Sequence, residues 1–354
     1  MANKSERIFY FDALRALAIL LVISLHACGH IAEIIPFDAH TIYSFHGVFA
    51  TFETNFFRIG VDLFIMLSGA LLLGRDWAVG GFLKKRINRL VKPFLFWSVV
   101  FSIALILASY FIPSMNFVTQ FGVMDILMVF WNTITFQAPG SVVYWFFWMM
   151  LGVYLLMPLL NRWINGAEMS HVEGFLIVWM IYLVLAYSLM VPIPEVISFF
   201  VAPVGFAVLG YYLRYTERGI FKNHAVIWAL ILVPTIAMLL YAYSLIDVDI
   251  LFIFERYSVP VMLVATGVFC LFKNSEWLNN LPVSLKNIIV SVSVCSYGMY
   301  LIHSQIMMIV RKVIYLPQNY WLDFAILLLA GFVFSWIIIY VLSKIPVLND
   351  FIGV

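Results

Sequence analysis

The chain has 354 residues, of which 64% are hydrophobic and only 11% are charged. Soluble domains are about 45–50% apolar and about 25% charged, so this composition excludes a protein that folds in water alone. The net charge of +2 is too small to indicate a nucleic-acid partner, and Cys28, Cys270 and Cys295 have neither a CxxC spacing nor a Cys/His spacing typical of a metal site.

Ten apolar runs approach the length of about 20 residues that a helix needs to cross a bilayer. They lie at 9–28, 59–74, 94–112, 142–160, 174–191, 196–213, 225–246, 256–272, 292–310 and 322–343. The run at 59–74 is short, Pro203 interrupts the run at 196–213, and residues 121–136 resemble an amphipathic segment at the membrane interface. The sequence therefore predicts an all-α, polytopic integral membrane protein of about ten transmembrane helices, with residues 1–354 as a single membrane domain and no soluble domain.

The basic residues predict the orientation, because cytoplasmic loops carry an excess of lysine and arginine. If the N-terminus is cytoplasmic, fifteen basic residues fall on the inner side and only four on the outer side, which are Arg58, Arg256, Arg311 and Lys312. We therefore expect a multi-pass protein of the cell membrane with both termini in the cytoplasm. The two longest loops, 29–58 and 113–141, are then external.

The first predicted helix carries three ionisable residues, each of which is costly in a membrane unless it is paired or hydrated. Arg15 and His26 are eleven residues apart, close to three turns, so they share one helix face about 16 Å apart along the axis. Asp12 lies three residues before Arg15, within pairing distance. Asp12 and Arg15 form either a structural ion pair or part of a catalytic site. For His26 a function is favoured, because a histidine suits proton transfer near neutral pH.

A basic stretch, FLKKRINRLVKP at 82–93, precedes the third predicted span on its cytoplasmic side. One interpretation is an anchor that contacts anionic lipid without specificity. Arg86 and Arg89, however, are three residues apart on a helix, and two guanidinium groups on one face suit phosphate recognition. Charge alone leaves both interpretations open.

Three further features are candidate parts of a site. Asp62 is a carboxylate in the second span, where Gly60, Ser68 and Gly69 predict close helix packing. His303 in the ninth span either shares a polar cavity with His26 or hydrogen-bonds a neighbouring helix, and the structural interpretation is slightly favoured. The aromatic cluster at 144–148, which begins with Tyr144 and Trp145, is typical of an interfacial belt, although such rings also stack on sugars.

Five stretches in register resemble the membrane acyltransferase-3 family of bacterial and archaeal O-acyltransferases. They are FDALRALA at 11–18 leading to His26, GVDLFIMLSG at 60–69, RINRLVKP at 86–93 (a match to the family's Arg-x-x-Arg loop), WFFWMMLGVYLLMP at 145–158 and SYGMYLIH at 296–303. The likeness extends from residue 7 to about 345. The chain is most similar to the short, stand-alone branch that acts on surface polysaccharides, which includes the enterobacterial common antigen O-acetyltransferase.

The resemblance implies an acyl-CoA donor, usually acetyl-CoA, that is used from the cytoplasm without a metal. Arg86 and Arg89 would hold the CoA phosphates, the pantetheine arm would pass Arg15, and the thioester would meet His26. Our hypothesis is transfer to a hydroxyl of a carbohydrate or glycolipid, with His26 as general base and Arg15, held by Asp12, stabilising charge. Asp62 and His303 are second-rank candidates for the acceptor site.

Several alternatives remain at the level of sequence. An acyl-histidine intermediate is compatible with the same residues, whereas an acyl relay through Cys28 is disfavoured because the thiol has no obvious activator. The second candidate function is a transporter or flippase for a lipid-linked glycan, and the third is a sensor or assembly subunit with a decayed site. The sequence leaves the acyl group, the acceptor hydroxyl and the oligomeric state undetermined.

Overall fold

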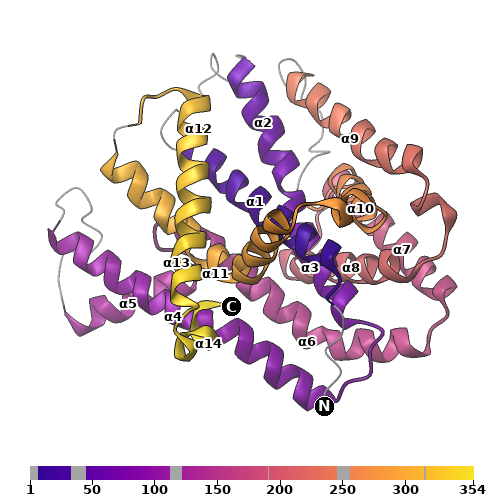
Figure 1. The fold of residues 1–354 in the computed structure, drawn as a ribbon, viewed down its shortest axis with the longest axis horizontal. Helices are drawn as coiled ribbons and strands as arrows, with labels where there is room; N and C mark the ends of the chain where they lie inside the picture. The colour runs from indigo at the N-terminus through magenta and orange to yellow at the C-terminus, as the bar shows by residue number, and fades with distance from the viewer. Residues whose placement is uncertain (1–6, 33–44, 112–121, 190, 245–255, 315) are drawn as a thin grey trace. The chain divides into compact units, whose positions relative to one another are not determined.

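The computed structural model describes residues 7–32, 45–111, 122–189, 191–244, 256–314 and 316–354, and these ranges contain helices and no strand (Figure 1). The predicted all-α class is confirmed. Residues 33–44 and 113–121 of the two predicted external loops lie outside the described residues, as do the ends of the runs predicted at 94–112 and 225–246.

Nine helical stretches among the described residues are long and apolar enough to cross a membrane. They are α1 (Phe9–Ala32), α2 (Phe45–Phe57) with α3 (Ile59–Leu72), α4 (Val79–Phe111), α6 (Trp145–Gly166), α7 (Met169–Leu183) with the π-helical turn Val184–Ser188, α8 (Glu195–Tyr215), α9 (His224–Ser244), α11 (Val283–Val313), and α12 (Tyr320–Leu329) with α13 (Ser335–Leu342). Shorter helices are α5 (Val123–Ile134), α10 (Val259–Lys273) and α14 (Asn349–Ile352). The predicted multi-pass membrane architecture is therefore confirmed.

The structure differs from the predicted runs at several helices, including α1, α4 and α11, which are longer than predicted. The short run at 59–74 is only part of an apolar helical stretch, Gly47–Leu72, so residues 45–57 of the predicted loop 29–58 form helix α2. Pro203 does not interrupt α8. A proline frees one backbone group of its helix from hydrogen bonding, and in a membrane protein neighbouring helices can supply another partner for that group. The run at 256–272 becomes α10, which has 15 residues and is shorter than the other predicted spans.

The chain forms two compact units. The first unit comprises Met1–Asp76 and Leu156–Val294, and the second comprises Trp77–Leu155 and Cys295–Val354. Two of the three boundaries fall inside α6 and α11, and the third lies between α3 and α4. The expected single domain spanning 1–354 stays a prediction, and each unit is described by itself.

Helix α3 lies at the centre of the packing in the first unit, against α8 and α1. The approach to α8 is close, because a methyl group added to Gly69 would overlap the backbone of Ala207 and one added to Gly210 would overlap the backbone of Met66. Towards α1, a methyl group on Gly60 would lie 2.7 Å from the carbonyl oxygen of Ala18. The predicted role of Gly60 and Gly69 in close helix packing is confirmed.

In the second unit, α4 packs against α5 and α14. The basic stretch at 82–93 is not a loop, because α4 begins at Val79 and continues through Pro93 into the apolar part of the helix. The short helix α14 is held in place by Ile352, which is fully buried and whose carbonyl oxygen accepts a hydrogen bond from Nε1 of Trp97 at 3.3 Å. Gly353, in the left-handed region at φ 89°, lies against Gly298 of α11. The backbone of 349–353 is therefore firmly attached to this unit.

Candidate functional site

The start of α1 holds a buried carboxylate in a mostly apolar helix. Asp12 is 4% exposed, and it accepts two hydrogen bonds from Arg7, from Nε at 2.5 Å and from Nη2 at 2.8 Å. This two-point geometry is the strong arrangement for an arginine and a carboxylate. The hydrogen bond to Asp12 raises the pKa of Arg7, so Arg7 keeps its charge.

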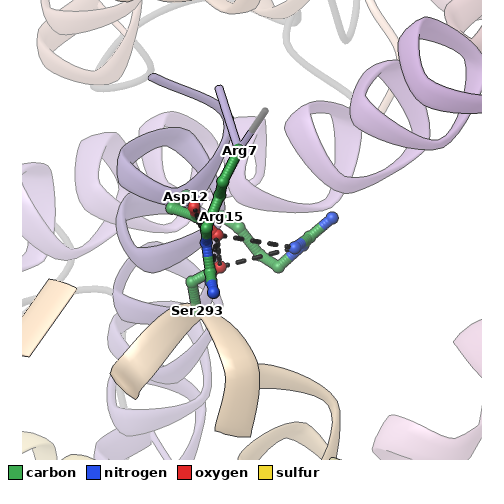
Figure 2. A network of polar contacts seen from close by, with 4 residues as sticks. All are labelled: Arg7, Asp12, Arg15 and Ser293. Atoms are coloured by element: carbon green, nitrogen blue, oxygen red, sulfur yellow. Dashed lines mark hydrogen bonds and ion pairs between the residues drawn. The ribbon is translucent and has the colours of Figure 1, made fainter. Parts of the chain in front are cut away.

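Ser293 connects this pair to Arg15 (Figure 2). Its hydroxyl donates to Oδ1 of Asp12 at 2.7 Å and accepts from Nη1 of Arg15 at 3.4 Å. The direct distance between Nη1 of Arg15 and Oδ1 of Asp12 is 4.0 Å, at the outer limit of an ion pair. The four side chains form one network that joins α1 to the N-terminal half of α11, with two guanidinium groups around one carboxylate.

The network differs in detail from the predicted pair. The structure brings Asp12 and Arg15 into the same cluster, but the closer partner of Asp12 is Arg7 rather than Arg15. Sequence reasoning missed the role of Arg7, because Arg7 precedes the helix and lies five residues from Asp12, outside the helical pairing distances of three and four. It also missed Ser293, which is 281 positions from Asp12 and lies in no charged or polar motif.

His26 lies in the same unbroken helix, and it is half-buried. Two residues further on, Sγ of Cys28 donates to Oε2 of Glu53 at 3.7 Å, and both side chains are buried. Glu53 belongs to α2, in a segment that the sequence predicted to be an external loop. Cys28 thus has a carboxylate partner that sequence reasoning missed.

Asp62 is 1% exposed, and neither of its carboxylate oxygens has a hydrogen-bond partner among the described residues. Arg58 and Arg256 act on it electrostatically. Tyr257 also interacts electrostatically with Asp62. Its hydroxyl group is buried and likewise has no hydrogen-bond partner among the described residues. Its backbone is in the left-handed region at φ 69°, which is a strained conformation for an aromatic residue. Strained backbone conformations of this kind are enriched at functional sites.

The remaining predicted substrate-binding residues belong to the second unit. His303 is fully buried, and its Nδ1 lies 2.7 Å from the carbonyl oxygen of Tyr300, so Nδ1 carries the hydrogen. Tyr144 is also fully buried, and its hydroxyl donates to the carbonyl oxygen of Leu301 at 3.3 Å. Trp145 is half-buried. His26 belongs to the first unit and His303 to the second.

A basic cavity of about 420 Å³ lies beside the N-terminal half of α4. It is lined by Lys85, Asn88, Arg89, Lys92, Pro93, Asn349, Asp350, Gly353 and Val354. Lys85, Arg89 and Lys92 are spaced four and three residues apart, so one face of α4 presents three positive charges to the cavity. This charge and volume suit a small anionic ligand or the charged part of a larger one.

The two predicted phosphate-binding arginines differ in their placement. Arg89 lines the basic cavity and is exposed, whereas Arg86 is half-buried and is not among the lining residues. The spacing of three residues suggested that both side chains share a face. The face that borders the cavity instead runs through Lys85, Arg89 and Lys92, which sequence reasoning had treated as one undivided basic stretch.

In a comparison with known protein families, residues 8–340 match the model of the acyltransferase 3 family, described as an acyltransferase domain. The match covers nearly the whole chain, including the start of α1, the basic face of α4 and α11. No protein of curated function and no solved structure matches the chain.

Proposed function

This chain belongs to the acyltransferase 3 family of membrane acyltransferases, and we propose that it is an acyl-CoA-dependent O-acyltransferase of the cell membrane. It takes an acyl group, normally acetyl, from cytoplasmic acyl-CoA and transfers it to a hydroxyl of a surface or lipid-linked polysaccharide at the outer side. The acceptor class follows the resemblance to the stand-alone branch of the family that acts on surface polysaccharides. The family match over residues 8–340 is the observation that carries this proposal.

The network at the start of α1 supports a site for charge stabilisation. Arg15 is 31% exposed at its side chain, so it is less enclosed than Asp12, which is held by Arg7 and Ser293. In the proposed reaction Arg15 faces the thioester oxygen as negative charge develops there. Arg7, Asp12 and Ser293 are positioning residues that fix the guanidinium group of Arg15.

His26 is the proposed general base. It removes the proton from the acceptor hydroxyl, the hydroxyl oxygen attacks the thioester carbonyl carbon, and the carbon–sulfur bond breaks. The proton then passes to the departing sulfur, so the products are the O-acyl ester and CoA with a free thiol. Proton transfer of this kind contributes about 10²–10⁴-fold to a rate.

The basic cavity supports the donor part of the proposal. Arg89 borders a cavity in which phosphate groups would meet three positive charges, and Arg86 lies one turn earlier on the same helix. CoA carries phosphate groups at one end and the thioester at the other, so a basic cavity is the appropriate partner for the first end. The passage of the pantetheine arm past Arg15 is part of the same proposal.

The acceptor is assigned to the residues with aromatic and hydroxyl-binding character. Asp62 offers two oxygens and Tyr257 one hydroxyl group that have no hydrogen-bond partner in the described chain, and buried polar atoms of this kind require a partner. Sugar hydroxyl groups would supply it. Trp145, Tyr144 and His303, which belong to the second unit, remain proposed acceptor residues in their own right.

The test uses the full-length protein in lipid nanodiscs with radiolabelled acetyl-CoA and a glycolipid extract. We expect release of CoA and label in the glycolipid fraction, and neither without protein. If folded protein consumes neither acetyl-CoA nor succinyl-CoA, but moves an intact lipid-linked glycan across a vesicle membrane, the transporter interpretation replaces this one.

A further inference from the structure

We propose that Asp350 is an internal counter-ion of the basic cavity. Its carboxylate pairs with Lys92 until a phosphate group of the ligand displaces it. This rests on the proposed function, because acyl-CoA is the phosphate-bearing ligand that such an enzyme would use. The inference adds to that function a residue that selects the charge of the ligand.

The first observation is an ion pair inside the cavity wall. Nζ of Lys92 lies 3.0 Å from Oδ2 of Asp350, and both residues line the cavity. The ammonium group also lies 5.6 Å from the ring centroid of Phe351, the next residue of α14. Lys92 is therefore drawn towards α14, whereas neither Lys85 nor Arg89 forms an ion pair with this helix among the described residues.

The second observation is that the backbone of α14 is fixed, whereas the side chains of Asp350 and Lys92 are exposed to solvent. The backbone of α14 is fixed by buried Ile352 and by the bond from Trp97, so Asp350 stays beside the cavity. Its side chain, in contrast, is 74% exposed, and that of Lys92 is 41% exposed. The carboxylate can thus rotate into solvent without any movement of the helix.

The carboxylate of Asp350 competes with the anionic groups of a ligand for Lys92. An ion pair this exposed is weak, because water screens the charges and two flexible side chains must be ordered. A carboxylate ligand carries a single charge and offers Lys92 no advantage over Asp350. A phosphate group carries up to two charges and three acceptor oxygens, and it meets Lys85 and Arg89 at the same time. Asp350 therefore disfavours singly charged anions and admits ligands with phosphate groups.

The same chemistry has two sources, the phosphate groups of a CoA-type ligand and the headgroup of an anionic lipid. The experiment measures binding of adenosine 3′,5′-bisphosphate, which carries no acyl group, to the full-length protein in zwitterionic nanodiscs at low salt. It compares wild type with Asp350→Asn, Lys92→Ala and the double variant. Lys84→Ala is the matched control, since Lys84 is an exposed lysine of α4 that does not line the cavity.

We expect Asp350→Asn to bind the bisphosphate about three- to tenfold more tightly, because it removes both the competitor and a repulsive charge. Lys92→Ala should weaken binding of the bisphosphate. In the double variant, Asp350→Asn should increase the affinity markedly less than it does when Lys92 is present. Lys84→Ala should resemble wild type. Equal or weaker binding by Asp350→Asn, in protein that melts as wild type does, overturns the proposal.

A second arm replaces the zwitterionic lipid with phosphatidylglycerol. If the bisphosphate does not bind but the lipid shows the same dependence on Lys92 and Asp350, the ligand is a lipid headgroup and the counter-ion role stands. If neither ligand shows that dependence, the proposal fails. Acetyl-CoA turnover is read separately, so normal turnover with unchanged binding by Asp350→Asn refutes this inference alone. Bisphosphate binding without turnover refutes the proposed function alone.

Discussion

Asp12 shows how a charged residue is accommodated in an apolar helix. An unpaired carboxylate in a membrane is costly, and here Arg7 supplies two hydrogen bonds and Ser293 a third. These bonds leave Arg15 at 4.0 Å, linked to the carboxylate mainly through the serine hydroxyl. The alignment of Arg15 therefore depends on a neutral residue of another helix.

Replacing Ser293 with alanine tests that dependence. Ser293→Ala removes one bond to Asp12 and one from Arg15, and a bond to a charged group is worth about 1.5–3 kcal/mol. We expect kcat for acyl transfer to fall at least tenfold while the KM for acetyl-CoA changes little. Ser284→Ala, at an exposed position of α11, should leave both constants unchanged. A rise in KM alone would show that Ser293 serves donor binding instead.

Cys28 provides a second test at this scale. Its thiol contacts the carboxylate of Glu53, and the proposed direct transfer from the thioester to the acceptor hydroxyl does not use it. We expect Cys28→Ala to retain acyl transfer within about threefold. Mass spectrometry of wild type quenched during turnover should show no hydroxylamine-sensitive acyl adduct at this residue. Such an adduct, together with an inactive Cys28→Ala variant, would establish the acyl relay that the sequence disfavoured.

At the scale of elements, the contact between α3 and α8 supports the part of the first unit that contains Asp62. Gly69 and Gly210 each face the backbone of the other helix, so side chains are excluded from the contact. Small residues at such a contact let two helices approach closely in a membrane, where packing replaces the hydrophobic effect as the driving force.

We therefore expect Gly69→Ala to destabilise the protein. The added methyl group would overlap the backbone at Ala207, and overpacking of this kind costs about 1–3 kcal/mol, or roughly 3–10 °C in the melting temperature. Gly174→Ala in α7 is the control, because no atom lies within 4 Å of the added group. Equal melting temperatures for the two variants in nanodiscs would show that the helices move apart at little cost.

The same elements show what the sequence can predict. Long apolar runs identify the spans because length and composition decide whether a helix crosses a bilayer. The sequence pattern was weaker at the ends of the helices. Helix α2 was therefore predicted to be a loop, and the basic stretch of α4 was matched to a loop of the family. Ser293 and Asp350 had no signal, because their partners Asp12 and Lys92 are 281 and 258 positions away and only the tertiary fold brings them together.

At the scale of the whole molecule, the family match extends across both compact units. The first unit contains the network of Asp12 and Arg15, His26 and Asp62, and the second contains the basic cavity and His303. The proposed reaction assigns charge stabilisation and proton transfer to the first unit and phosphate recognition to the second. Variants in the two units should therefore separate turnover from donor binding.

The most direct test of that account is the effect of His26→Ala on acetyl-CoA in nanodiscs, with His224→Ala, at an exposed position of α9, as the control. Because His26 is proposed to act only as general base, we expect donor binding to stay within about threefold of wild type while transfer falls about 10²–10⁴-fold. His224→Ala should keep both. Transfer at the wild-type rate by folded His26→Ala would contradict the account.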